Sequence, residues 1–94
     1  MTDAERMQML QDKALSLFRE RNAAYGSSFK TYGVLGVVCQ VLSAVARLPQ
    51  MVLWAPEHGK GTPEKLRDVM LDIANYALMT ILCIEDGNWD GRPQ

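Results

Sequence analysis

Residues 34–48 read VLGVVCQVLSAVARL, and the expected fold follows from this stretch. Apolar side chains cover nearly the whole circumference of the helix it predicts, and the polar stripe consists of Gln40, Ser43 and Arg47. A helix that is apolar on most sides must be covered on several of them. Because the chain has 94 residues, its other helices can hardly supply that cover. We therefore expect a homo-oligomer in which a second subunit covers this helix.

Apolar spacing and capping residues predict three helices and no strand. Thr2 and Glu5 form a capping box for the first helix, and Thr62 caps the third, which stops at Gly87. Pro49 should kink or end the second helix, because it lacks an amide donor. The fold class is all-α: two long antiparallel helices plus an N-terminal helix, forming a helical bundle by homo-oligomerisation. The helices span roughly residues 3–22, 29–53 and 63–86 of a single domain, 1–87, which a flexible tail follows at 88–94.

Composition and charge exclude several classes of partner. The net charge is −1 and no basic run exists, so no nucleic-acid partner is expected. Cys39 and Cys83 lie in apolar runs, which is typical of core thiols in a reducing compartment. Residues 1–10 are acidic and lack the layout of a signal peptide, and residues 34–48 are too short and too polar to span a bilayer. We expect a cytoplasmic protein with no membrane partner.

One face of the third predicted helix carries polar side chains every three or four residues: Glu64, Asp68, Asp72 and Asn75. The same face continues with the apolar Met79 and Leu82, so its inner end should meet a partly buried seam. Acids in such a place repel one another unless a cation joins them, and Mg²⁺ binds carboxylate oxygens. The candidate metal ligands are Glu64, Asp68 and Asp72. The alternative is ordinary salt bridging to Arg47, Arg67 or Lys65.

The segment between the first two predicted helices has the ingredients of an anion pocket. Serine hydroxyls, the amides at a helix start and Lys30 could bind phosphate, and Tyr25 and Phe29 offer rings on which a base could stack. The alternative is a Gly-Ser turn with a solvated lysine and core aromatics. His58 lies in a second loop, at 54–61, without the clustered ligands that zinc needs.

Several blocks of the sequence resemble a known family. They are Tyr25-Gly26-Ser27-Ser28-Phe29, Ala46-Arg47-Leu48 and Asp72-Ile73-Ala74-Asn75-Tyr76-Ala77, with Glu64 and Asp68 ahead of the last. The chain resembles the nucleotide modification associated domain proteins of phages and bacteria, distant relatives of the MazG-like pyrophosphohydrolases and dimeric dUTPases. The resemblance implies a helical bundle of two or more chains with a nucleotide between helices. Active enzymes of that group hold Mg²⁺ with acidic pairs on two adjacent helices, whereas here the second helix offers Gln40, Ser43 and Arg47.

The leading hypothesis is an oligomeric nucleotide-binding protein of phage origin. It would hold a phosphorylated nucleotide between helices of adjacent subunits, and could sequester a nucleotide signal used in host defence. Mg²⁺ is not required in this interpretation and no catalytic residue is predicted. One alternative is a Mg²⁺-dependent nucleotide pyrophosphohydrolase that takes its missing acids from the first helix, for example Glu20, or from another subunit; another is an interaction protein without a small ligand. The predicted ligand-binding residues are Tyr25, Ser27, Ser28, Lys30, Arg47, Asp72, Asn75 and Tyr76.

Overall fold

The computed structural model describes residues 1–52 and 62–92, and within them the chain is helical, without a strand. The predicted all-α class is therefore confirmed. The loop predicted at 54–61, with His58, lies outside the described residues. The elements in chain order are α1 (Asp3–Tyr25), the short 3-10 helix η1 (Ser28–Tyr32), α2 (Gly33–Val52) and α4 (Pro63–Glu85).

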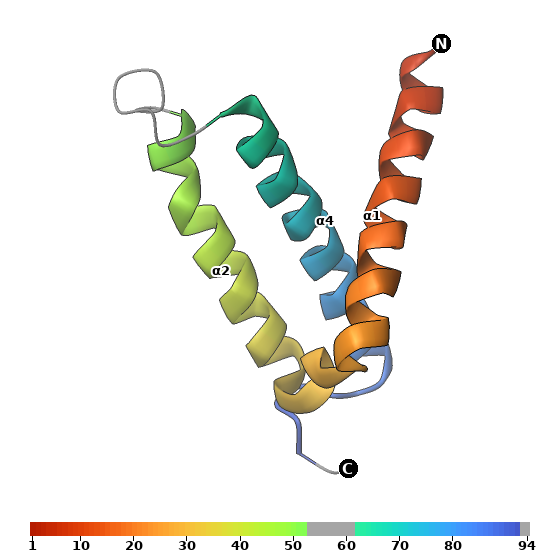
Figure 1. The fold of residues 1–94 in the computed structure, drawn as a ribbon. Helices are drawn as coiled ribbons and strands as arrows, with labels where there is room; N and C mark the ends of the chain where they lie inside the picture. Colours follow the sequence, from red (N-terminus) through yellow and green to blue (C-terminus); the bar gives the residue numbers. More distant parts are fainter. Residues whose placement is uncertain (53–61, 93–94) are drawn as a thin grey trace.

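The two long helices α2 and α4 lie side by side and run in opposite directions (Figure 1). Val34 and Val37 of α2 pack with Cys83 of α4 in a small buried core, and Phe29, Tyr76 and Met79 close it at the edge. The predicted core position of Cys83 is confirmed. Cys39 differs from the prediction, because it lies on the exposed side of α2 in the single chain.

The predicted caps of the first and last helices are present. The Thr2 hydroxyl accepts a hydrogen bond from the Glu5 amide at 3.1 Å, and the Thr62 hydroxyl accepts one from the Lys65 amide at 3.1 Å. Pro49 lies inside α2, which continues to Val52 instead of ending at the proline. The missing amide removes one hydrogen bond in the last helical turns, where few further bonds depend on it.

The C-terminal segment differs from the predicted boundary at residue 87. Asn88 and Trp89 accept hydrogen bonds through their carbonyls from the Val34 and Leu35 amides, at 3.0 and 2.9 Å. These carbonyls satisfy the first free amides of α2, a helix start that no side chain caps. The described part of the predicted flexible tail, residues 88–92, is therefore attached to the start of α2.

Helix α1 is loosely attached to the rest of the fold. Of its 23 residues, all of them described, Ala14 alone is buried. Figure 1 shows its N-terminal end standing apart from α2 and α4. Its attachment depends on one buried hydrogen bond, in which Asn75 Nδ2 of α4 donates to the Ala14 carbonyl at 2.9 Å, and on contacts near its C-terminal end. A helix held by so few contacts leaves much of its apolar stripe without cover.

The segment Ser28–Val52 is long and apolar enough to cross a membrane, by length and composition alone. This differs from the expectation that the stretch is too short and too polar. An apolar helix that is covered by neighbouring helices or by a second subunit has the same composition. The hydropathy of this segment therefore does not distinguish a membrane span from a subunit contact.

Candidate functional site

A small pocket of about 230 Å³ opens where the C-terminal end of α1 meets η1, α2 and α4. It combines one guanidinium, three amide side chains, hydroxyls and aromatic rings, which is the mixture expected of a small-molecule site. Its residues come from four elements, α1, η1, α2 and α4, and the residues of α4 lie far from the others in the sequence. They are Phe18, Arg21, Asn22, Tyr25, Gly26, Ser28, Phe29, Gln40, Asn75, Tyr76 and Met79.

Arg21 is the cation of this pocket, and it is fixed by Asp72. Its Nη1 donates to Asp72 Oδ1 at 2.7 Å across 51 residues of sequence. The hydrogen bond to Asp72 raises the pKa of the Arg21 guanidinium. Since arginine has five donors, the remaining N–H groups of the guanidinium can bind an anion while Asp72 holds the group at Nη1.

The aromatic side chains of the pocket differ in how far they are packed or exposed. Phe18 and Phe29 pack edge to face, with ring centroids 5.9 Å apart, and so join α1 to η1. Tyr76 is half-buried, whereas Tyr25 is 75% exposed. An exposed ring beside a guanidinium is available for stacking against a planar ligand without first breaking a core contact.

Four of the predicted ligand-binding residues line this pocket: Tyr25, Ser28, Asn75 and Tyr76. Asp72 lies beside it as the partner of Arg21, and Ser27 Oγ donates to Asn22 Oδ1 at 3.4 Å. The buried Asn75 uses its amide nitrogen to hold Ala14, so its first role is structural.

The two cations among the predicted ligand-binding residues, Lys30 and Arg47, lie elsewhere. Lys30 Nζ contacts Asp86 Oδ2 at 2.8 Å, and this hydrogen bond raises the pKa of the lysine. Arg47 is exposed on α2 and is not part of the pocket lining. The salt-bridge partner of Asp72 also differs from the sequence alternatives, because it is Arg21 and not Arg47, Arg67 or Lys65.

The predicted metal ligands do not converge within one chain. Glu64 and Asp68 are exposed on the first turns of α4, and Asp72 is engaged by Arg21. Across residues 1–52 and 62–92, no group of three or more acidic, histidine or cysteine side chains lies close enough to hold a metal ion. The Mg²⁺ site therefore stays a prediction, and it would need ligands from another chain.

Sequence reasoning missed Arg21, Asn22 and the pocket position of Gln40. Helical spacing could have found the first, because Arg21 and Tyr25 are four residues apart and share a face of α1. Asn22 is adjacent to that face. The helical spacing of α1 does not predict which carboxylate forms a salt bridge with Arg21, because the approach of α1 to α4 depends on tertiary packing.

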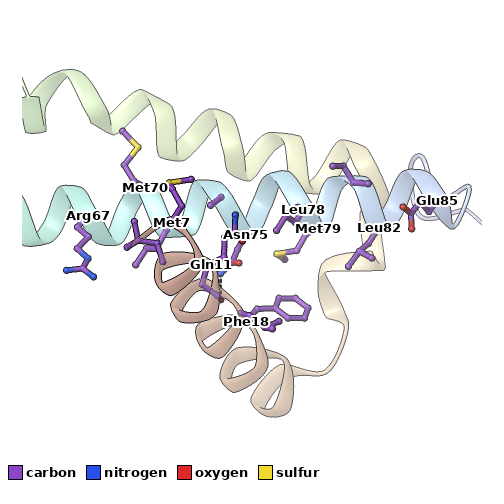
Figure 2. A pocket seen from close by; sticks show the side chains of 16 residues that line it. Met7, Gln11, Phe18, Arg67, Met70, Asn75, Leu78, Met79, Leu82 and Glu85 are labelled. Atoms are coloured by element: carbon purple, nitrogen blue, oxygen red, sulfur yellow. Dashed lines mark hydrogen bonds between the residues drawn. The ribbon is translucent and has the colours of Figure 1, made fainter. Parts of the chain in front are cut away.

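A larger, almost entirely apolar groove lies between α1 and α4 (Figure 2). Its volume is about 660 Å³. Phe18, Asn75 and Met79 line both this groove and the small pocket, so the two share a wall. The side chains that α4 contributes include Met70, Leu71, Ala74, Leu78, Ile81 and Leu82, and α1 contributes Met7, Leu10 and Leu15.

Comparison with known proteins gives no matching family model, no similar curated protein and no similar solved structure. The resemblance to the nucleotide modification associated domain family stays a prediction. Function is therefore argued from the geometry of the pocket.

Proposed function

We propose that this protein binds a phosphorylated nucleotide in the pocket around Arg21 and does so as a homo-oligomer. One observation carries the proposal: four separate elements bring a fixed guanidinium together with aromatic rings and amide side chains. Arginine suits phosphate because its planar fork can make two parallel hydrogen bonds. The rings of Tyr25 and Tyr76 suit a base, and Asn22 and Gln40 can donate to or accept from its edge.

The size of the pocket supports a shared site. Its volume of about 230 Å³ is below the range of roughly 300–1,000 Å³ that is typical of ligand pockets. In this proposal one chain would enclose part of the nucleotide, and a neighbouring subunit would supply the remaining wall. This agrees with the expectation that the ligand lies between helices of adjacent subunits.

The exposed apolar face of α2 supports the oligomer. Its side chains recur at intervals of three, four, three and seven residues, as on one face of a helix, and each is exposed in the single chain. Burying them removes apolar surface from water, at about 25 cal/mol per Å². The residues of this face are Leu35, Val38, Leu42, Val45 and Val52.

Binding is favoured over hydrolysis by the state of Asp72. Its carboxylate is hydrogen bonded to Arg21, and would have to leave that guanidinium to coordinate Mg²⁺. A guanidinium at the same place repels a metal cation and attracts phosphate. We propose that the nucleotide is held intact. Phage origin and a cytoplasmic location are further parts of this proposal: the first depends on the family resemblance, and the second on the N-terminal sequence and the two thiols. Sequestration of a defence signal is inferred from the small size, the oligomeric core and the acids missing from the second helix.

The test is a thermal-shift series with one nucleoside and its mono-, di- and triphosphate, with and without Mg²⁺. A ligand at a hundred times its Kd adds about 2.7 kcal/mol to the free energy of unfolding, which for a domain of this size is a rise in Tm of about 10 °C or more. We expect a phosphorylated form to raise Tm more than the nucleoside does, without dependence on Mg²⁺.

Two variants test whether the nucleotide binds in the pocket around Arg21. Arg21→Gln should weaken binding of the phosphorylated form about 10- to 100-fold, because a hydrogen bond to a charged group contributes roughly 1.5–3 kcal/mol. Arg19→Gln is the matched control, since Arg19 is an exposed arginine two residues away that does not line the pocket. Equal loss in both variants, or no shift with any nucleotide, would reject the proposed site. Turnover of the nucleotide would reject binding without hydrolysis.

A further inference from the structure

The groove face of α4 has the spacing of a helix–helix interface. Its central residues recur at intervals of four, three, four, three and four, which is the heptad spacing that keeps one stripe against a partner helix. Apolar residues fill the middle of this stripe, and a charged residue stands at each end. In chain order the stripe is Arg67, Leu71, Ala74, Leu78, Ile81 and Glu85.

The stripe is symmetric about its middle, and its two ends carry opposite charges. Arg67 and Glu85 lie nine residues from Tyr76, one before it and one after it. At a rise of 1.5 Å per residue, Arg67 and Glu85 are therefore about 27 Å apart along the helix axis. Figure 2 shows them at the two ends of the groove. Within the described part of the chain, neither makes an ion pair. They are too far apart to pair with each other inside one chain.

We propose that the groove binds the α4 helix of a second copy of this chain, in antiparallel orientation. A two-fold axis that crosses the stripe midway between Ala74 and Leu78 then places Arg67 of each chain beside Glu85 of the other. The same symmetry sets Met70 against Leu82 and Ala74 against Leu78, so that apolar groups meet apolar groups along the stripe. A parallel arrangement would place like charges together at both ends, and opposite charge at the two ends therefore selects the antiparallel register.

The proposal also accounts for the loose attachment of α1. Met7, Leu10 and Leu15 are exposed along the same groove, where a second α4 would cover them. The groove is lined by 16 residues, against roughly 20–30 on each side of a standard interface. We therefore expect an association that depends on protein concentration.

This inference rests on the proposed function, since it specifies how the homo-oligomer is assembled. Its test measures self-association and does not involve nucleotide. Because Phe18, Asn75 and Met79 line both cavities, a helix in the groove would lie against the back wall of the small pocket. If the protein associates through α4 but binds no nucleotide, the α4 interface stands and the nucleotide site is rejected. If it binds nucleotide but does not associate through α4, the nucleotide site stands and the α4 interface is rejected.

The test is charge reversal measured by sedimentation velocity at several protein concentrations. Arg67→Glu places two acids at each end of the antiparallel pair, and Glu85→Arg places two cations there. Each variant should weaken self-association on the order of tenfold, because two exposed ion pairs of up to about 1 kcal/mol become repulsive. An equimolar mixture of the two variants should associate at least as tightly as wild type, since every Glu then meets an Arg across the interface.

The chain that carries both reversals should also regain wild-type association, because each pair is restored with its sign inverted. Both side chains are exposed, so at a protein concentration too low for association the variants should unfold at the wild-type urea concentration, within about 0.5 kcal/mol. A wild-type chain that stays monomeric at high micromolar concentration overturns the proposal. So does an oligomer that neither single reversal weakens, because the apolar face of α2 would then account for the assembly.

Discussion

At the residue scale, Asn75 joins α1 and α4, which contribute side chains to both cavities. It is buried, and its amide nitrogen donates to the Ala14 carbonyl at 2.9 Å. Asn75→Ala removes this bond and should lower the free energy of unfolding by about 1–3 kcal/mol. Urea unfolding measures the loss, and amide hydrogen exchange should show faster exchange in α1 than in α4. Gln8→Ala removes an exposed hydrogen bond to Asp12 and serves as the control, with a change within about 0.5 kcal/mol. Equal losses in the two variants would contradict this role.

Cys83 gives a residue-scale prediction about pH. Burial raises the pKa of its thiol, so the folded chain keeps the proton at pH values where the unfolded chain has lost it. Stability from this group is complete below the ordinary thiol pKa of about 8.5 and is lost as pH rises toward the higher folded value. The raised pKa of Lys30 acts in the same direction at still higher pH. Urea unfolding at pH 7.5 and 9.5 should therefore show lower stability at the higher pH. The decrease should shrink in Cys83→Ala and persist in Cys39→Ser, whose side chain is exposed.

At the scale of elements, the contact between the C-terminal segment and the start of α2 requires a glycine. Gly33 has a φ of +59°, and a Cβ there would meet the Asn88 carbonyl oxygen. Gly33→Ala should cost about 1–3 kcal/mol of strain in addition to displacing residues 88–92. Gly26→Ala is the matched control: its φ is +65°, with open space around the added carbon. Urea unfolding should give a clearly lower free energy of unfolding for Gly33→Ala than for Gly26→Ala. Similar values for the two variants would show that the contact with Asn88 contributes little to stability.

Local rules predicted the helices and their caps, because Thr2 and Thr62 act on amides three residues away. The attachment of residues 88–92 to α2 could not be predicted in this way, since it depends on carbonyls that meet helix amides more than 50 residues distant. The candidate site likewise contains residues that a local pattern predicts and a pairing that depends on tertiary packing. Tyr25 and Ser28 belong to one local motif, whereas the pairing of Arg21 with Asp72 follows from the approach of α1 to α4.

At the scale of the whole molecule, the chain is more open than its length requires. Its radius of gyration is 15.2 Å, whereas a compact domain of this length has about 12 Å. Two apolar surfaces account for much of the exposed hydrophobic area: the outer face of α2 and the groove between α1 and α4. Each is long enough to pair with the same surface of another copy, and two different two-fold contacts close into an assembly of four chains when their axes cross at a right angle.

This arrangement predicts how the assembly should come apart. Val45 on α2 and Leu78 on α4 are exposed in the single chain, at 44% and 60%, so a charge at either position leaves the fold of one chain intact. In the assembly each would be buried, where an unpaired carboxylate is strongly unfavourable. Val45→Asp should leave dimers joined through α4, and Leu78→Asp should leave dimers joined through α2, each with twice the 10.5 kDa mass of one chain. The double variant should be a folded monomer by light scattering and circular dichroism. If either single variant already gives monomers, one surface carries the whole assembly, and the tetrameric arrangement is wrong.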